Sequence, residues 1–346
     1  MKDKKNQQQN LVSSGYFQKP DLNERVDEII SEIAKETSFK PIRLLGKSGW
    51  WGSKTIGAFH YKGKFNDKNC ILKVQGTKLP ISEVYNIESF AKQNKSNLVR
   101  PPHLYKTISW SDKKRYEALI MEDVGNKKII SVPTNNKEVD LFFKLLLEYR
   151  NNCRNKPWIN KPKEISSKMI TVHFNKWRKA SKEIYKTHVL RDKEDDLLID
   201  RAIKVLTKGY HETDLEFQHG HFGDADIYKV GKQYILLSNL YWSWRPPFYD
   251  AIFGYHWFRY HLVDVKNITE NEVEKQKNLW LTIIDTLPYL ITKRDKLLLK
   301  LALLERATAA LNLDALSIDT KAPISKYLVI STREEVKDLL KDLSNT

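Results

Sequence analysis

The first third of the chain combines one amphipathic helical pattern with short apolar runs that are typical of strands. Apolar residues recur at helical spacing from Leu22 to Ile33, which predicts a helix there. A second helix is predicted over residues 82–93, with Ser82 as its N-cap. Strands are predicted at 42–45, 55–61, 70–74, 104–110 and 115–121. Three strands, one helix and two strands in this order indicate a small sheet-rich lobe.

Beyond Gly125 the apolar pattern becomes mostly helical. Helices are predicted at 139–149, 172–185, 195–206 and within 250–310, with one strand-like interruption between Ile227 and Leu237. Residues 121–125 form a short extended link before them. The pattern therefore predicts a flexible polar tail over residues 1–20, a sheet-rich N-lobe over 21–124 and a helical C-lobe over 125–346.

Composition supports a folded protein of this organisation. The 346 residues correspond to about two domains of roughly 150 residues, and 41% hydrophobic content excludes a disordered chain. The only two cysteines, Cys70 and Cys153, exclude a disulfide framework and fit a reducing compartment. The N-terminal residues lack the apolar stretch of a signal peptide, and charged residues interrupt the most apolar segment, 297–313. We therefore expect a soluble, cytoplasmic protein that does not bind membranes.

The charge balance leaves two interpretations of the surface. Lys and Arg number 59 against 43 Asp and Glu, which gives a net charge of +16. A polyanion partner such as a nucleic acid would explain this excess, because lysines that neutralise phosphates release counterions. The lysines are spread along the whole chain without a block of five or more like charges, which favours a well-solvated surface. Nucleic-acid binding stays an alternative that is not favoured.

The first segment with candidate chemistry is rich in glycine. Gly46, Gly49 and Gly52 lie between two predicted strands, and Lys73 lies on the third. Glycines allow backbone N–H groups to approach phosphates closely, and a lysine nearby supplies a positive charge. The alternative is an ordinary glycine hairpin beside a surface lysine.

A glutamate follows this lysine at the start of the second predicted helix. Glu83 is followed by Ile87 and Phe90 at helical spacing, which predicts that Glu83 lies on the inward face of this helix and is a candidate partner for a buried charge. Glu88 is the competing partner, and the apolar spacing favours Glu83. A solvated helix glutamate is the alternative for both.

Two later segments complete a resemblance. His219-Gly220-His221 is followed by Asp226, and a predicted strand through Ser238 is followed by Pro247-Phe248-Tyr249-Asp250. Together with the glycine segment and Lys73, this order over residues 40–310 resembles the kinase-like fold of the aminoglycoside phosphotransferase and choline kinase family. The link at Met121 and Glu122 is similar to the segment in which that family binds adenine through backbone groups.

The resemblance implies a two-lobed protein-kinase-like α+β fold that binds ATP, or another nucleoside triphosphate, with Mg²⁺ between the lobes. It also implies a small hydroxylated molecule as the phosphate acceptor, although the sequence does not identify it. In the family a helix glutamate fixes the phosphate-binding lysine, so the resemblance pairs Glu83 with Lys73. The residues that the resemblance assigns to nucleotide binding are Gly46, Gly49, Gly52, Lys73, Glu83, Met121 and Glu122.

The sequence departs from the family at the residues that carry the chemistry. His221 stands where the family has its catalytic aspartate, and Asp226 replaces a metal-binding asparagine. Ser238, or Asn239 with a one-residue slip, replaces the aspartate that holds magnesium. A neutral imidazole can act as a base near pH 7, and Asp226 retains one carboxylate for the metal, whereas Ser238 is a poor ligand. Metal-dependent transfer is therefore not favoured.

Three hypotheses follow from these residues. In the first, the protein is a phosphotransferase in which His221 is the base, while Asp226 and Ser238 face the metal. In the second, it is a pseudokinase that binds nucleotide without catalysis. In the third, a kinase-like scaffold binds a polyanion. A zinc site of His219 and His221 with Asp224 or Asp226 is not favoured, because no third strong ligand lies nearby in the sequence, and a structural role is preferred for His219.

Overall fold

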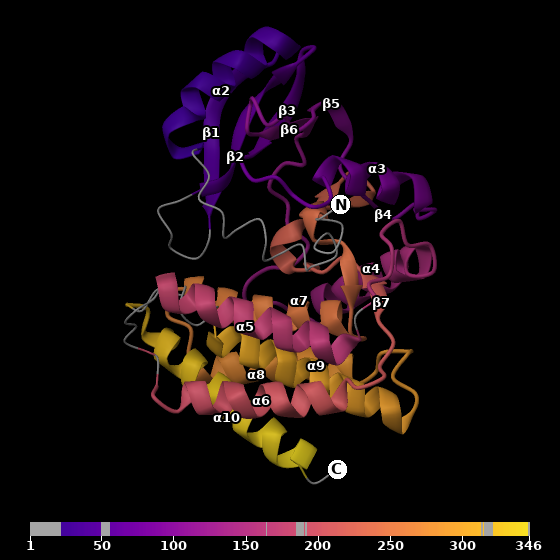
Figure 1. The fold of residues 1–346 in the computed structure, drawn as a ribbon, viewed down its shortest axis with the longest axis vertical. Helices are drawn as coiled ribbons and strands as arrows, with labels where there is room; N and C mark the ends of the chain where they lie inside the picture. Colours follow the sequence, from indigo (N-terminus) through magenta and orange to yellow (C-terminus); the bar gives the residue numbers. More distant parts are fainter. Residues whose placement is uncertain are drawn as a thin grey trace, which may run out of the picture. The chain divides into compact units, whose positions relative to one another are not determined.

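The computed structural model divides the chain into two compact units, which are described separately (Figure 1). The structure describes residues 22–49, 56–163, 165–184, 190, 192–312, 314 and 321–344. We call Met1–Lys127 with Tyr228–Tyr241 the sheet unit, and Lys128–Ile227 with Trp242–Thr346 the helical unit.

The sheet unit is built on a five-stranded antiparallel sheet of order β1-β2-β3-β6-β5. Asn66 and Asp67 join two of its strands with φ of 47° and 60°, the left-handed backbone that a two-residue hairpin turn requires. The strands are β1 (Lys40–Gly49), β2 (Ile56–Phe65), β3 (Lys68–Gln75), β5 (Leu104–Ile108) and β6 (Glu117–Glu122).

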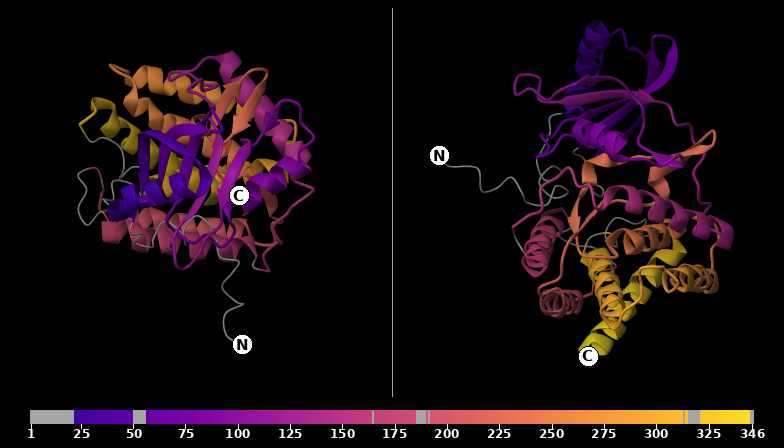
Figure 2. Two further views of the ribbon diagram at one scale, coloured as in Figure 1. Left: turned by 90° about the horizontal axis from the view of Figure 1, so that it is seen from above. Right: turned by 90° about the vertical axis from the view of Figure 1, so that its right-hand side faces the viewer.

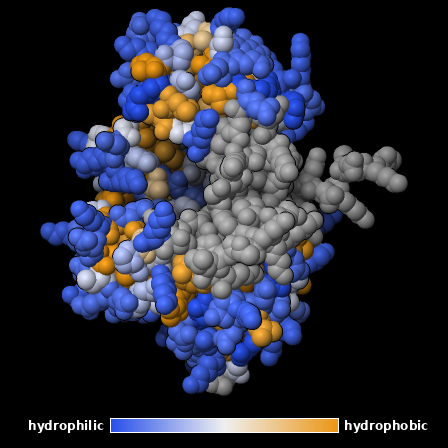
Figure 3. All heavy atoms as spheres, turned by 90° about the vertical axis from the view of Figure 1, so that its left-hand side faces the viewer, coloured by the Kyte–Doolittle hydropathy of each residue, from blue (hydrophilic) through white to orange (hydrophobic). Residues whose placement is uncertain are grey.

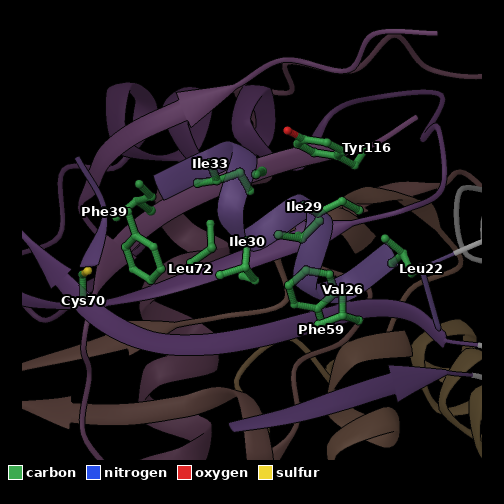
Figure 4. Close-up of a cluster of buried hydrophobic side chains, with 13 residues drawn as sticks. Leu22, Val26, Ile29, Ile30, Ile33, Phe39, Phe59, Cys70, Leu72 and Tyr116 are labelled. Atoms are coloured by element: carbon green, nitrogen blue, oxygen red, sulfur yellow. The ribbon is translucent and has the colours of Figure 1, made fainter. Parts of the chain in front are cut away.

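Helix α2 (Leu22–Thr37) covers one face of this sheet (Figure 4). Its apolar stripe packs on buried strand side chains, and each large aliphatic residue buried there contributes about 1.5–3 kcal/mol. The helix supplies Leu22, Val26, Ile29, Ile30 and Ile33, and the strands supply Phe59, Cys70, Leu72, Val74, Ala118 and Ile120.

Helix α3 (Glu83–Gln93) belongs to the opposite face of the sheet. Its Ile87 is clustered with Ile71, Leu119 and Met121. Strand side chains alternate between the two faces, so Lys73, two residues after Ile71 on β3, also lies on the α3 face. The sheet therefore separates an apolar α2 face from a face that carries a lysine.

A second, three-stranded sheet of order β4-β9-β8 explains why residues 228–241 belong to the sheet unit. Strand β4 (Val99–Arg100) pairs in parallel with β9 (Gln233–Leu236), which neighbours β8 (Ile227–Val230). The sequence places these residues within the helical lobe. The difference arises because this pairing joins segments that are far apart in the chain, and such a pairing produces no pattern in the sequence around either strand.

The helical unit is arranged around α9, which packs against α5, α6, α7 and α10 (Figure 2). A short antiparallel pair, β7 (Glu216–Gln218) with β10 (Ser243–Arg245), flanks the helices. The helices are α4 (Asn136–Cys153), α5 (Ser166–Ile184), α6 (Asp195–Gly209), α7 (Tyr249–His261), α8 (Glu270–Ile284), α9 (Lys293–Asn312) and α10 (Pro323–Ser344).

The α+β class and most elements expected from the sequence are present. Two differences stand out: the single strand expected at 227–237 is a pair, β8 and β9, with Gly231 in the turn at φ 59°, and α10 was not expected. On the face drawn in Figure 3, hydrophilic side chains predominate and apolar ones form small groups. In the described part of the chain, no helix is both long and apolar enough to cross a bilayer.

Candidate functional site

A buried ion pair is the central feature of the sheet unit. Ser82 caps α3 by accepting a hydrogen bond from the Val84 N–H at 3.1 Å, which places Glu83 in the first turn of the helix. The Lys73 Nζ lies 2.5 Å from the Glu83 Oε2, and the two side chains are only 9% and 4% exposed. Glu88 is exposed on the same helix. The predicted pairing of Lys73 with Glu83 is therefore confirmed, and the alternative partner Glu88 is wrong.

A second carboxyl group lies close to this pair. Glu117 on β6 is buried, and burial together with the neighbouring Glu83 carboxylate holds the pKa of Glu117 above its ordinary value. Lys73 opposes this shift. The lysine ammonium is thus held by one carboxylate and lies near a second carboxyl group whose ionisation burial disfavours.

The glycine segment is only partly described. Gly46 and Gly49 belong to β1 itself, where they pair with His60 and Ile56 of β2. Gly52 lies outside the described residues, as does the rest of the expected loop. A Cβ added at Gly46 would meet no heavy atom of the described residues within 4 Å. Two of the three glycines therefore lie on the strand rather than in a loop.

Both the side chain and the backbone N–H of Glu122, at the end of β6, form hydrogen bonds with other residues of the sheet unit. Its carboxylate accepts from the Arg100 guanidinium and from the His103 N–H at 2.7 Å, and its own N–H donates to the His103 carbonyl at 3.0 Å. Burial opposes ionisation, but these donors hold the pKa of Glu122 below its ordinary value. The neighbouring Met121 is 8% exposed and packs in the α3-face cluster. Glu122 thus links β6 to β4 and to the segment that follows β4.

In the helical unit, a buried aspartate anchors the loop that follows β7. Asp250, in the first turn of α7, accepts the Gly220 N–H at 2.9 Å and the Tyr149 hydroxyl. Gly220 has a φ of 80°, which favours glycine. His219 is fully buried among aromatic rings, and its Nδ1 accepts the His221 N–H at 3.3 Å. Asp250, the last residue of the Pro-Phe-Tyr-Asp motif, therefore holds the backbone of the loop.

The loop presents a histidine–aspartate pair. The His221 Nδ1 lies 2.7 Å from the Asp226 Oδ2, and the two side chains are 18% and 10% exposed. The imidazole packs on the rings of Phe253 and Trp257, with centroid distances of 4.6 and 5.3 Å. A carboxylate bound to one ring nitrogen sets the orientation and tautomer of the imidazole. His221 and Asp226 are thus brought together.

The other aspartate of this turn is also bound to a histidine. Asp224 is 1% exposed, and the His261 Nδ1 at the end of α7 lies 2.9 and 3.1 Å from its two oxygens. Burial opposes the charged imidazole, but Asp224 raises the pKa of His261 above its ordinary value. Within the described ranges, no three His, Cys, Asp or Glu side chains form a group that could hold a metal ion.

The residues expected at the magnesium position do not match that ion well. Asn239 is fully buried and donates to the Leu236 carbonyl at 2.8 Å, so its side chain closes its own turn. Ser238 offers a hydroxyl, and the carboxylate of Asp226 is already bound to His221. Magnesium prefers carboxylate and phosphate oxygens in an octahedron, so this donor set does not fit a dedicated magnesium site.

The sequence pattern does not identify three ionisable residues near these groups. Glu117 reads as an ordinary strand residue, and His261 lies at the end of a helix with no motif around it. His60 is identified only by the strand register, which pairs it with Lys73. A pattern along the chain cannot show which residue lies opposite another on the next strand.

Comparison with known proteins identifies the fold. No family model and no curated protein matches the chain in sequence. A thermostable mutant of aminoglycoside phosphotransferase APH(4)-Ia, solved with ADP and hygromycin B, is similar in structure, with a TM-score of 0.55 and 10% identity over 92% of this chain and 98% of that one. The choline kinase of Cryptosporidium parvum Iowa II has a TM-score of 0.55 and 11% identity over 91% and 97% of the two chains.

Amicoumacin kinase hAmiN, solved with AMP-PNP, Ca²⁺ and Ami, has a TM-score of 0.52 and 10% identity over 92% of this chain and 95% of that one. At such low identity these likenesses establish the fold and not the activity. The chain has the two-lobed kinase-like fold of aminoglycoside phosphotransferases and choline kinase. Its scaffold is therefore phosphotransferase-like.

Proposed function

We propose that the protein binds a nucleoside triphosphate such as ATP through its sheet unit and acts as a pseudokinase. The observation that carries this proposal is the buried Lys73–Glu83 ion pair at 2.5 Å. Burying a lysine and a glutamate together contributes little to folding, because the desolvation cost offsets their attraction. In kinase-like proteins such a pair holds a lysine beside the α- and β-phosphates. Solved proteins of the same fold carry ADP or AMP-PNP, which supports the same ligand class here.

Residues of the helical unit support the part of this proposal that excludes metal-dependent phosphate transfer. The loop keeps its anchor on Asp250 but carries His221 in place of a carboxylate, and the carboxylate of Asp226 is shared with that imidazole. Ser238 offers no charge. The nucleotide is therefore held by Lys73 and by N–H donors of the sheet unit, and its binding does not depend on magnesium.

Thermal melts with and without ATP, each with EDTA or magnesium, test this function. A ligand at 100 times its dissociation constant stabilises a protein by about 2.7 kcal/mol, which is visible as a melting shift. We expect ATP to produce the shift in EDTA. A shift that requires magnesium would contradict metal-independent binding, and no shift under any condition would contradict nucleotide binding itself.

Variants of the ion pair complete the test. Lys73→Ala alone would leave Glu83 buried without its partner, so the neutral double variant Lys73→Met/Glu83→Gln is the better probe. We expect this variant to fold and to lose the ATP shift. Lys64→Ala is the matched control, because Lys64 lies on β2 of the same sheet and is exposed.

A second function is favoured by one specific observation, the 2.7 Å contact between His221 and Asp226. In this alternative the imidazole accepts the proton of an acceptor hydroxyl as its oxygen attacks the terminal phosphate, and ADP leaves. Asp226 stabilises the imidazolium that forms. The acceptor is a small hydroxylated molecule. ADP production that depends on such an acceptor, and that is lost in both His221→Ala and Asp226→Asn, would establish this alternative in place of the pseudokinase.

A further inference from the structure

The strand register places three chemically distinct residues in one row across the sheet. Gly46 of β1 pairs with His60 of β2, and His60 pairs with Lys73 of β3. Directly paired residues on neighbouring strands point to the same face, and adjacent strands lie about 4.8 Å apart. His60 therefore lies one strand away from Lys73, on the face that carries Glu83 and α3.

The environment of His60 keeps its imidazole uncharged. The side chain is half-buried, and burial together with the neighbouring Lys73 ammonium lowers its pKa to about 3. A neutral imidazole beside Lys73 adds no repulsion, and one of its ring nitrogens carries a proton that can be donated. On its other side, a Cβ added at Gly46 would meet no heavy atom of the described residues within 4 Å. Among the described residues, a polar donor therefore lies next to a lysine and borders space that no side chain fills.

We infer that His60 contacts the nucleotide directly, by donating a hydrogen bond from its neutral imidazole to a phosphate oxygen held beside Lys73. This inference rests on the proposed nucleotide-binding function and deepens it. A polyphosphate bound without a dedicated metal site needs several N–H donors, and the row supplies two of them at neighbouring positions. The ligand class that this row recognises is the phosphate part of a nucleoside di- or triphosphate, independently of the base.

The alternative role for His60 is packing within the sheet. Replacing a histidine that only packs would change the stability of the free protein, and it would change the binding of ATP, ADP and adenosine alike. Replacing a histidine that donates a hydrogen bond to phosphate would weaken the binding of only those ligands that carry phosphate. Comparing these three ligands therefore separates the two roles.

The experiment is a titration of the full chain with ATP, ADP and adenosine in EDTA at pH 7.5, using wild type, His60→Ala and His60→Gln. A hydrogen bond to a charged group is stronger than one between neutral groups, so we expect His60→Ala to weaken ATP and ADP binding by about tenfold or more. His60→Gln retains a neutral donor, and we expect its affinity to stay within about threefold of wild type. Adenosine binding should not change in either variant.

Lys64→Ala is the matched control for this titration, because Lys64 lies on the same strand and, at a spacing of four residues, on the same face as His60. Melts without ligand measure any loss of folding separately. If His60→Ala binds ATP as tightly as wild type, or weakens adenosine binding as much as ATP binding, His60 does not donate a hydrogen bond to phosphate. The proposed nucleotide site still stands in that case. If wild type binds none of the three ligands, the proposed function fails, and the role of His60 fails with it.

Discussion

The two units retain different parts of the kinase-like arrangement. In the sheet unit, Lys73 and Glu83 form the buried ion pair that the resemblance implies. In the helical unit, Asp250 holds the Gly220 N–H, and the loop that it anchors carries His221 and a histidine-bound Asp226 where the resemblance implies other residues. The difference shows that a loop can be held in place while the side chains that it carries depart from a family pattern, because the anchor acts on the backbone.

Burial favours the neutral form of ionisable groups in both units. In the sheet unit, burial and Lys73 keep His60 neutral. In the helical unit, burial favours the protonated form of a carboxyl group, since it raises the pKa of Glu305 to about 7 against the opposing effect of Arg245. Because His60 is a base and Glu305 is an acid, these two residues make the stability of the protein respond to pH in opposite directions.

The largest expected effect is the loss of the loop anchor. Asp250→Ala removes the acceptor of the Gly220 N–H and the Tyr149 hydroxyl, both of which are buried. Each buried polar group left without a partner costs about 1–3 kcal/mol, so we expect a loss of about 3 kcal/mol or more in urea denaturation. His221→Ala should cost less, because His221 does not anchor the backbone. Equal losses in the two variants would show that the loop is not held through Asp250.

Glu305 should make the protein more stable in mild acid. Its pKa is about 4.5 in the unfolded chain and about 7 in the folded protein, so its contribution is full below pH 4.5 and is lost as the pH rises to 7. The loss over this window is about 3 kcal/mol, at about 1.4 kcal/mol per pH unit. Glu305→Gln removes a titrating group while keeping an acceptor for the Tyr210 hydroxyl. Urea denaturation from pH 4.5 to 7.5 measures the difference, and identical pH profiles for the two proteins would contradict it.

His60 should have the opposite and smaller effect in the accessible range. Its folded pKa of about 3 lies below its unfolded value of about 6.5, so its contribution is full above pH 6.5 and is lost as the pH falls. At pH 5 the loss amounts to about 2 kcal/mol. We expect the variant His60→Gln to be less sensitive to acid than wild type between pH 5 and 7. If His60→Gln and wild type lose the same stability, the imidazole is not held neutral.

The elements of both units were largely predictable because their patterns are local. The stripe from Leu22 to Ile33 and the Ser82 cap each occupy a few consecutive turns, and the structure confirms both. The β4–β9 pairing was not predictable, because its partners are distant in the chain and β4 has only two residues. Helix α10 was missed at the end of the chain.

The same contrast holds for the candidate site. Lys73 and Glu83 are close in sequence on adjacent elements, so their spacing and the family resemblance together predict the pair. The binding of Asp224 by His261 and the position of His60 beside Lys73 depend on packing and on register between strands. Such contacts join residues that carry no shared motif, and they are visible only in the folded chain.

The most direct test of the account is a titration with ATP in EDTA that compares one altered site in each unit. The account predicts that wild type and His221→Ala bind ATP with affinities within about threefold of each other, because His221 does not belong to the unit that binds the nucleotide. A threefold change corresponds to only about 0.7 kcal/mol. It predicts that Lys73→Met/Glu83→Gln does not bind. If His221→Ala loses ATP binding while the Lys73/Glu83 double variant retains it, nucleotide recognition does not belong to the sheet unit and the account is wrong.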